Sequence, residues 1–482
     1  MEEILRAAVD AALGDGTRAA EARIVAPYHY EQLAVRNGQA SGLTSTTRVG
    51  LSVRVRRARA WGFATSPTVD AESARRVARD AVSAARAAER TSRAPLEVVP
   101  NRGPSNGQYK TRLKVDPFSI PMEEKLRLLT DAERGLHVDP AVKSGHASYR
   151  AWSEEKWFLS SEGARFHSRI VQVGAGLDAT AVRGSEVQVR SAPSSFGGNF
   201  RQSGFEFIEG LDLPSIAEPT AREAVKLLTA PTLRAGPTTI VLGSSQLALQ
   251  VHESVGHATE LDRILGFEAG FAGTSFLSPS DRGHLRYGSP LMEVVADATE
   301  PGGLGTFGWD DEGVPAQRTP LVRKGQLVGF LTSRETAALI GVERSGGTSR
   351  GDGPDRMPLI RMTNIDLLPG DHSFDELLEG VREGVFFDTN RSWSIDDKRL
   401  NFQFGTEVGR RIVRGELGPL VRNPIYSGMT PEFWGSMDAV GDASTWKLWG
   451  VPNCGKGQPG QVARVGHGAP AGRFRNVRVR GG

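Results

Sequence analysis

The residues best suited to chemistry lie in the stretch VHESVGHATE (residues 251–260), where two histidines flank a glutamate. Histidines four positions apart, as in H-E-x-x-H, lie on one helix face and bind zinc together. Here His252 and His257 are five apart, and five helical steps of about 100° place the second ring roughly 140° from the first. A π-type turn would absorb the extra residue, and Gly256 would ease that distortion. The spacing therefore predicts a metal-binding helix that departs from regular α geometry between Glu253 and His257.

A catalytic zinc site needs three protein ligands and an open position for water, so a third ligand must come from elsewhere. One candidate is Glu260, which lies three positions after His257 and so on the same side of a helix. The other is Cys454, the only cysteine, in the glycine-rich stretch NCGKG. Glycines let the backbone approach a site closely, and Lys456 favours the thiolate form. The residues leave both ligands open, with a buried apolar role as the alternative for the cysteine.

Two further side chains are candidates for roles around the metal. Glu253 follows the first histidine directly, which places its carboxylate beside the metal as a general base for a bound water. A plain exposed helix glutamate is the alternative. His467, in the stretch GHGAP, is expected either to orient a ligand or contact substrate, or to lie on the surface.

An acidic turn and one arginine complete the set of candidates. Asp310, Asp311 and Glu312 precede Gly313, and we expect a structural turn rather than residues that line the site or bind a peptide N-terminus. Arg361 is expected either to bind a substrate carboxylate or to form a structural ion pair. The matches to G-x-S-x-G at residues 347–351 and to G-x-G-x-x-G at residues 455–460 lack the strand and helix context that those motifs need.

The motif helix needs elements that hold it in place, and the sequence predicts them. Residues 237–243 are typical of a strand that runs into the helix, with Ser244 or Ser245 as N-cap. Apolar residues repeat every four positions in the helix and form a stripe that would dock on the core: Leu247, Val251 and Val255.

The two halves of the chain differ in their patterns, which predicts an α+β fold with two domains. Residues 1–235 are expected to form a mixed domain with a largely antiparallel sheet, and residues 236–482 a β-rich domain that carries the metal-site helix. In the first half, Asn37-Gly38 and residues 160–163 have the composition of hairpin turns. Predicted helices there span residues 2–13, 69–90 (capped by Asp70), 121–137 and 216–228, and predicted strands include 22–27, 30–36 and 50–57.

Composition excludes several classes of protein. The 482 residues are 39% hydrophobic and 24% charged, as in ordinary globular proteins. A net charge of +3, from 59 basic and 56 acidic residues, gives no strong case for a nucleic-acid partner and leaves weak anion binding open. The N-terminal MEEILRAA has acids where a signal peptide has bases, and no stretch approaches the roughly 20 apolar residues of a membrane span. We therefore expect a cytoplasmic protein, and one cysteine excludes intrachain disulfides.

Several motifs taken together resemble the TldD/PmbA family of metallopeptidases. They are HESVGHATELD (residues 252–262), GWDDEGVP (308–315), RMTN (361–364) and NCGKGQPGQ (453–461), with GLSVRV and WGFAT in the first half. The resemblance runs through most of the chain and is strongest after residue 236. It implies that His252, His257 and Cys454 are the metal ligands and that Glu253 is the catalytic glutamate.

The resemblance also implies an activity and a partner. It implies the TldD-like branch, which has the metal motif: a zinc-dependent peptidase with one Zn²⁺ per active subunit. The substrates would be unfolded or small peptides, bound in extended form in an enclosed cleft, with roles in peptide maturation or degradation. The subunit would form a homodimer or a heterodimer with a metal-less PmbA/TldE-like paralogue. The alternative is a non-catalytic binding or assembly subunit with a structural metal site.

Overall fold

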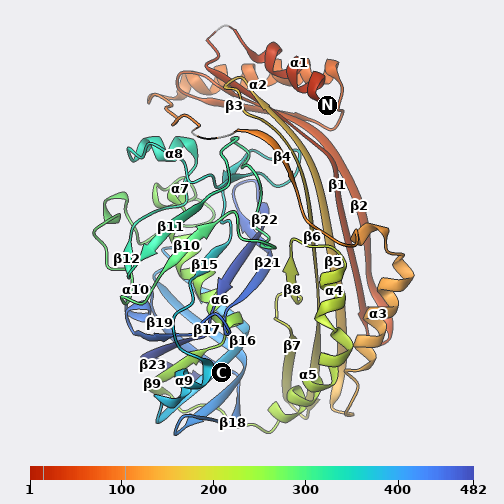
Figure 1. The fold of residues 1–482 in the computed structure, drawn as a ribbon, viewed down its shortest axis with the longest axis vertical. Helices are drawn as coiled ribbons and strands as arrows, with labels where there is room; N and C mark the ends of the chain where they lie inside the picture. The colour runs from red at the N-terminus through yellow and green to blue at the C-terminus, as the bar shows by residue number, and fades with distance from the viewer. Residues whose placement is uncertain (15, 102, 104) are drawn as a thin grey trace.

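A long antiparallel sheet curves around one side of a second strand-rich region in the computed structural model, which describes residues 1–14, 16–101, 103 and 105–482 (Figure 1). Residues before Gly236 build the first sheet, and residues from Gly236 on build the second region; no strand pairs across this division within those ranges. The largely antiparallel sheets with packed helices confirm the expected α+β class. None of the described helices has the length and apolar content that a bilayer span requires.

The N-terminal sheet has eight strands within the described ranges, in the order β3-β2-β1-β5-β6-β4, with β7 and β8 also paired to β6. All neighbours run antiparallel except β4 and β6. The strands are β1 Ala19–Arg36, β2 Gln39–Arg56, β3 Trp61–Ser66, β4 Asn106–Lys110, β5 Val142–Ser160, β6 Arg165–Arg183, β7 Glu186–Ala192 and β8 Asn199–Arg201.

The first hairpin of this sheet follows its sequence signals in one respect and departs from them in another. Asn37 and Gly38 form the turn between β1 and β2 with positive φ of 48° and 74°, as a two-residue hairpin turn requires. The prediction of two separate strands at 22–27 and 30–36 was wrong, because β1 continues through Pro27. A register shift between Val25 and Tyr28 accommodates the missing proline N–H.

Two groups of helices cover the N-terminal sheet. One group shares an apolar core with β1 and β2 at the end of the sheet that lies uppermost in Figure 1: α1 Glu2–Ala12 and α2 Ala71–Thr91. Asp70 caps α2, as predicted, by accepting a hydrogen bond from Ser73 N at 2.7 Å. The other group packs on β1, β5 and β6: the 3₁₀ turn Pro117–Ser119, α3 Met122–Arg134, α4 Glu206–Leu211 and α5 Leu213–Leu227.

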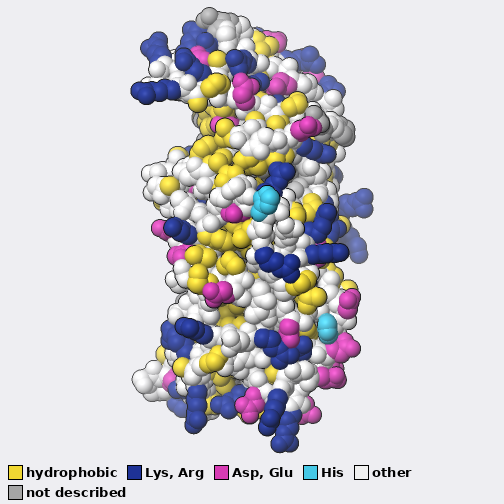
Figure 2. Space-filling view, turned by 90° about the vertical axis from the view of Figure 1, so that its left-hand side faces the viewer, with side chains coloured by type: hydrophobic (Ala, Val, Ile, Leu, Met, Phe, Trp, Pro, Cys, Tyr) yellow, Lys and Arg dark blue, Asp and Glu magenta, His cyan; other side chains and the backbone are white. Residues whose placement is uncertain are grey.

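The C-terminal region, residues 236–482, contains a seven-stranded sheet in the order β16-β9-β23-β19-β17-β18, with β20 paired to β23. These strands are β9 Gly236–Leu242, β16 Glu383–Ile395, β17 Asn401–Val413, β18 Glu416–Arg422, β19 Pro424–Met429, β20 Met437–Val440 and β23 Gly472–Gly481. Figure 2 shows the side of the molecule turned away from the curved sheet, where apolar side chains gather along the middle and Lys and Arg lie at both ends and on the right-hand side.

Smaller sheets and short helices fill the rest of the C-terminal region. A four-stranded sheet has the order β12-β11-β10-β15, and β13–β14 and β21–β22 are two-stranded. The strands are β10 Val294–Asp297, β11 Arg318–Arg323, β12 Gln326–Leu327, β13 Ser349–Arg350, β14 Leu359–Ile360, β15 Ile365–Leu367, β21 Lys447–Lys456 and β22 Gln461–Ala469. The helices are α6 Ser244–Val251, α7 Leu261–Ile264, α8 Arg334–Leu339, α9 Phe374–Glu379 and α10 Thr430–Gly435, with 3₁₀ turns at His257–Thr259 and Pro279–Asp281.

Helix α6 positions the histidine motif, and its first turn differs from the prediction. Gly243 is the N-cap, and the expected serine caps were wrong. Their hydroxyls make tertiary bonds instead: Ser244 Oγ donates to Ala469 O and Ser245 Oγ donates to Asp388 Oδ1, at 2.5 and 2.7 Å. The predicted apolar stripe is confirmed, since all three of its members are fully buried in the main core: Leu247, Val251 and Val255.

Candidate metal centre

Three side chains predicted to bind a metal lie together at the end of α6. One nitrogen each of His252 and His257 and the sulfur of Cys454 lie within 4.8 Å of one another. The two imidazole rings are nearly perpendicular, at 87°, with centroids 4.9 Å apart. Sγ of Cys454 lies 3.6 Å from Nε2 of His257. Residues 197 positions apart in the sequence (454 − 257) therefore form one buried cluster.

The helix widens where the spacing of the histidines requires it. After α6, residues His252–Gly256 form one π turn, in which His257 N–H donates to His252 O. The prediction of irregular geometry between Glu253 and His257 is confirmed. Gly256 has an ordinary helical φ of −54°, but a Cβ there would lie 2.4 Å from the sulfur of Met362. The glycine is therefore needed mainly for this close packing.

Cys454 is held by the β21–β22 hairpin and by one arginine. It faces Ala463 across the hairpin, beyond a register shift that follows Val451. Arg361 Nη2 donates to Cys454 O and Nη1 to Gln461 O, at 2.5 and 3.2 Å. This side chain has no carboxylate within 4 Å in the described ranges, so the structural ion pair, one of its two predicted roles, was wrong, and its partners are backbone carbonyls. Arg361 thus ties together the two strands that carry the thiol.

The hydrogen bonds of the imidazoles define which nitrogen each one offers to a metal. His467 is fully buried; its Nδ1 donates to Ile365 O at 3.2 Å, which leaves Nε2 as an acceptor. Nδ1 of His252 lies 2.7 Å from that Nε2 and must donate to it. The lone pair of His252 is therefore on Nε2. This hydrogen bond suits the orienting role predicted for His467, and its full burial shows that the predicted surface position was wrong.

Glu260 fixes the tautomer of His257 as His467 fixes that of His252. Its Oε2 accepts from His257 Nδ1 at 2.9 Å and from Arg263 Nε at 3.3 Å, and its Oε1 lies 3.4 Å from Lys456 Nζ. Nε2 of His257 is left facing Cys454. Because Glu260 bonds the far side of the ring, its position favours an orienting role over that of third ligand.

Burial and neighbouring charges set the protonation states that metal binding needs. Burial lowers the pKa of both His252 and His257, so both are neutral donors near pH 7. Burial raises the pKa of Cys454, but the adjacent His257 and the positive charge of Arg361 outweigh that effect and lower it overall. The pKa of Glu260 is well below its usual range because Lys456 and His257 outweigh burial. Neutral imidazoles, a readily formed thiolate and an ionised carboxylate suit a cation.

Glu253 has a partner that sequence reasoning missed. Arg399 Nη1 donates to Glu253 Oε2 at 2.6 Å, and the Glu253 side chain is 8% exposed. Arg399 lies in the turn between β16 and β17 with a positive φ of 62°. Its stretch, DDKRLN, has only the charges expected of an exposed turn, so no local signal pointed to this contact.

The acidic turn joins the two parts of the molecule, which confirms its expected structural role. Asp311 pairs with Arg23 at 2.8 Å and with Lys156 at 2.7 Å, both on the N-terminal sheet. Although burial raises its pKa, these two cations lower it to about 2. Glu312 lies 3.2 Å from Arg54 in the same way. Asp310 instead closes its own turn, accepting from the backbone N–H of Glu312 and of Val314.

Comparisons with known proteins agree with this geometry. The chain matches the PmbA/TldA metallopeptidase domain 1 over residues 28–85, the central domain over 115–230 and the C-terminal domain over 235–481. It is 34% identical over 452 residues to a metalloprotease of Methanothermobacter thermautotrophicus, covering 93% of this chain and 92% of that one. It is 25% identical over 372 residues to a Saccharolobus solfataricus protein named zinc metalloprotease TldD homolog, covering 74% and 76%. TldE from Thermococcus kodakarensis has a similar structure, with a TM-score of 0.76, 17% identity and 100% coverage of both chains.

These matches define a class of protein, a family of metallopeptidases with one shared fold. The chain belongs to the PmbA/TldD family, because the C-terminal model alone spans residues 235–481 and the archaeal relative aligns along nearly the whole chain. The predicted resemblance is thereby confirmed. The likeness to TldE, at 17% identity, shows the common fold.

Proposed function

We propose that this chain is a zinc-dependent peptidase in which His252, His257 and Cys454 bind one Zn²⁺ per active subunit. The observation on which this rests is the convergence of the three side chains within 4.8 Å, with both histidines fixed to offer Nε2. The name of the Saccharolobus relative, a zinc metalloprotease, supports the choice of metal.

The donor set fits zinc. Two imidazole nitrogens and a thiolate are ligands that zinc prefers, and a thiolate disfavours magnesium or calcium. The candidate group in the described part of the chain has three members, which leaves one coordination position open, as in catalytic zinc sites. When bound, zinc supplies Lewis acidity and lowers the pKa of a water to about 7.

Glu253 is the proposed general base. Arg399 engages its Oε2, so Oε1 is left to take a proton from the attacking water and later pass it to the leaving amine of the peptide. Arg399 holds the carboxylate in one orientation during both transfers. His467 and Glu260 keep the two histidines in the required tautomers throughout.

The proposed substrates are unfolded or small peptides that bind in extended form in an enclosed cleft, in peptide maturation or degradation in the cytoplasm. Main-chain pairing in such a cleft would recognise an extended shape more than a sequence. The proposed assembly is a homodimer or a heterodimer with a metal-less TldE-like paralogue. A TldE with the same fold supports this, because subunits of one fold can pair through equivalent surfaces.

The test is the substitution Glu253→Gln, which removes the base and keeps the shape. We expect unchanged zinc content and a loss of peptide cleavage of roughly 10²–10⁴-fold, the usual contribution of general base catalysis. Zinc is measured by elemental analysis and cleavage on an unfolded peptide. Glu432→Gln, at an exposed position of α10, is the matched control. Full activity of Glu253→Gln would exclude the proposed base.

The alternative, a non-catalytic subunit with a structural metal site, is favoured by one observation. Arg399 Nη1 lies 2.6 Å from Glu253 Oε2, and a buried ion pair of this kind also serves a purely structural purpose in many proteins. Under this alternative, zinc-loaded wild-type protein leaves a panel of unfolded peptides intact, alone and with a TldE-like partner. Cleavage of any of them that depends on zinc would decide for the peptidase.

A further inference from the structure

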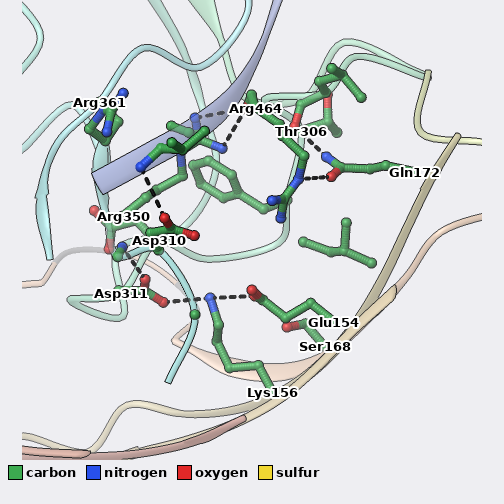
Figure 3. A pocket seen from close by; sticks show the side chains of 18 of the residues that line it. Glu154, Lys156, Ser168, Gln172, Thr306, Asp310, Asp311, Arg350, Arg361 and Arg464 are labelled. Carbon is green, nitrogen blue, oxygen red and sulfur yellow. Dashed lines mark hydrogen bonds and ion pairs between the residues drawn. The ribbon is translucent and has the colours of Figure 1, made fainter. Parts of the chain in front are cut away.

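A small cavity of about 60 Å³ lies where the N-terminal sheet meets the C-terminal region (Figure 3). Strands β5 and β6 line one side of it, and the acidic turn, β13 and β22 line the other. In Figure 3, Lys156 lies between Glu154 and Asp311, and Arg464 lies beside Gln172. The cavity is separate from the group of metal ligands but shares a hairpin with it, because the lining residue Ala463 faces Cys454 across β21–β22.

Three arginines line this cavity, and all of their hydrogen bonds go to neutral acceptors. Arg350 donates to the carbonyls of Met362 and Arg464. Arg361, only 1% exposed, donates to the carbonyls of Cys454 and Gln461. Arg464 donates to the Gln172 amide oxygen and, at 2.9 Å, to the Tyr28 hydroxyl. In the described ranges, none of the three guanidinium groups has a carboxylate within 4 Å. We call this site the arginine pocket.

The acidic side chains around the arginine pocket are engaged elsewhere. Glu154 and Asp311 both pair with Lys156, at 2.9 and 2.7 Å. Asp310 accepts hydrogen bonds from backbone N–H groups of its own turn and of Ser349. Asp352 Oδ2 accepts from Val462 N at 2.9 Å. The three arginines therefore lack a directly bound counter-charge.

The positive charges of the three arginines repel one another, and a bound anion would reduce this repulsion. Burial, together with the charges of Arg361 and Arg464, lowers the pKa of Arg350 to about 10, so this side chain is still protonated at neutral pH. Guanidinium groups favour carboxylates because both are planar and can form paired hydrogen bonds. A volume of 60 Å³ exceeds the roughly 10–15 Å³ that one water needs, so a small charged group fits.

We propose that the arginine pocket binds a carboxylate, supplied by the C-terminus or an acidic side chain of a peptide whose scissile bond lies at the metal centre. Arg361 connects the two sites physically, since it lines the pocket and holds the carbonyl of Cys454. The binding of a carboxylate goes beyond the proposed peptidase function. Its supply by a peptide substrate rests on that function.

The first experiment measures carboxylate binding without any activity. Thermal unfolding of the zinc-loaded wild-type protein is followed in acetate, acetamide or inorganic phosphate, with ionic strength held constant by chloride. Acetate at about ten times its Kd is expected to raise Tm by roughly 1–2 °C through mass action, and acetamide to have no effect. Equal Tm values in acetate and acetamide would overturn the proposal, as would a shift in phosphate alone.

Matched substitutions test whether the rise in Tm in acetate comes from binding in the arginine pocket. Arg464→Gln removes one guanidinium group from the pocket and is expected to abolish the acetate shift, whereas Arg478→Gln removes the same charge from an exposed position of β23 and is expected to keep it. Arg464→Lys retains the charge but loses the planar fork, so a reduced shift is expected. An acetate shift that persists in Arg464→Gln would overturn this location. If Arg464→Gln does not fold, Arg464→Lys and the wild-type comparison of acetate with acetamide decide.

The second experiment identifies the source of the carboxylate. The wild-type protein is assayed on matched peptides with a free C-terminus, an amidated C-terminus, and an amidated C-terminus with one aspartate exchanged for asparagine. We expect a KM at least tenfold lower for one carboxylate form, with kcat nearly unchanged, and loss of that preference in Arg464→Gln. Equal KM values for all three would overturn the peptide assignment. Absence of any cleavage would count against the proposed function alone, since the acetate measurement still tests the pocket.

Discussion

The metal centre and the contact between the N-terminal sheet and the C-terminal region are both buried and polar, but they are stabilised differently. At the centre, each histidine donates to one neighbour, His467 or Glu260, and all the residues come from the C-terminal region. At the contact between the regions, full charges pair across the boundary, as Asp311 does with Arg23 and Lys156. The difference indicates that hydrogen-bond direction orients the two histidines at the centre, whereas ion pairs across the boundary hold the acidic turn at the contact. Substitutions should therefore affect metal binding and stability separately.

The largest expected effect concerns the third ligand. Cys454→Ala removes a thiolate donor, whereas Glu260→Ala removes only the partner of a ligand, a change that typically costs 10–100-fold in metal affinity. We expect Cys454→Ala to weaken zinc binding by more than that. Competition with a chromophoric chelator measures both affinities. A greater loss in Glu260→Ala would make that carboxylate the third ligand and would remove the distinction between ligand and orienting residue.

The second largest expected effect is a loss in the free energy of unfolding, with no change in zinc binding. Asp311→Asn leaves Arg23 buried without its carboxylate, although Lys156 keeps Glu154, and breaking such a buried pair typically costs about 3–5 kcal/mol. Urea unfolding measures the change. Asp355→Asn is the matched control, because its pairs with Arg48 and Arg356 are largely exposed and such pairs contribute about 0–1 kcal/mol. A loss of zinc from folded Asp311→Asn protein would show that the metal centre depends on the contact between the two regions.

The smallest effect is a pH dependence at the same contact. Glu407 on β17 accepts from Arg190 Nη1, Ser191 N and Ser191 Oγ on β7, and burial outweighs these partners and raises its pKa from 4.5 to about 7. Between these two values the folded state binds more protons than the unfolded state. The contribution of Glu407 to stability is therefore fully present below pH 4.5 and is lost as the pH rises through 7.

The substitution Glu407→Gln tests this sign. The difference in unfolding free energy between wild type and variant should shift in favour of the wild type by up to roughly 3 kcal/mol as the pH falls from 8 to 5. Urea unfolding at both pH values gives the difference. A difference that is constant with pH, or that shifts in the opposite direction, would show that the carboxylate is not held in this raised state.

The sequence predicted what depends on local spacing and missed what depends on distant contacts. The five-residue separation of His252 and His257 predicted the π turn, since helix geometry alone relates spacing to direction. The glycine-rich setting of Cys454 and the family motifs indicated the third ligand. The pairing of Glu253 with Arg399 could not be predicted, because 146 positions separate them and the arginine lies in an ordinary charged turn.

Predictions of the fold also succeeded for local features and failed for distant contacts. Turns at Asn37-Gly38 and the cap at Asp70 depend on neighbours in sequence and were predicted correctly. The cap of α6 was not, because Ser244 and Ser245 bond to residues more than 140 positions away. The roles of Arg361 and the acidic turn likewise depended on partners that only the folded chain brings near.

The packing of Met362 against Gly256 has a consequence for how fast the centre exchanges its metal. Met362 fits against the π turn that carries both histidines, and its neighbour Arg361 holds the backbone of Cys454. Met362 and Arg361 thereby connect the two histidines to Cys454. We expect the three metal-binding side chains to move together as one rigid body. Such a preformed cage captures an ion without first having to fold around it, and it releases the ion slowly, because no single donor can swing away while the other two stay in place.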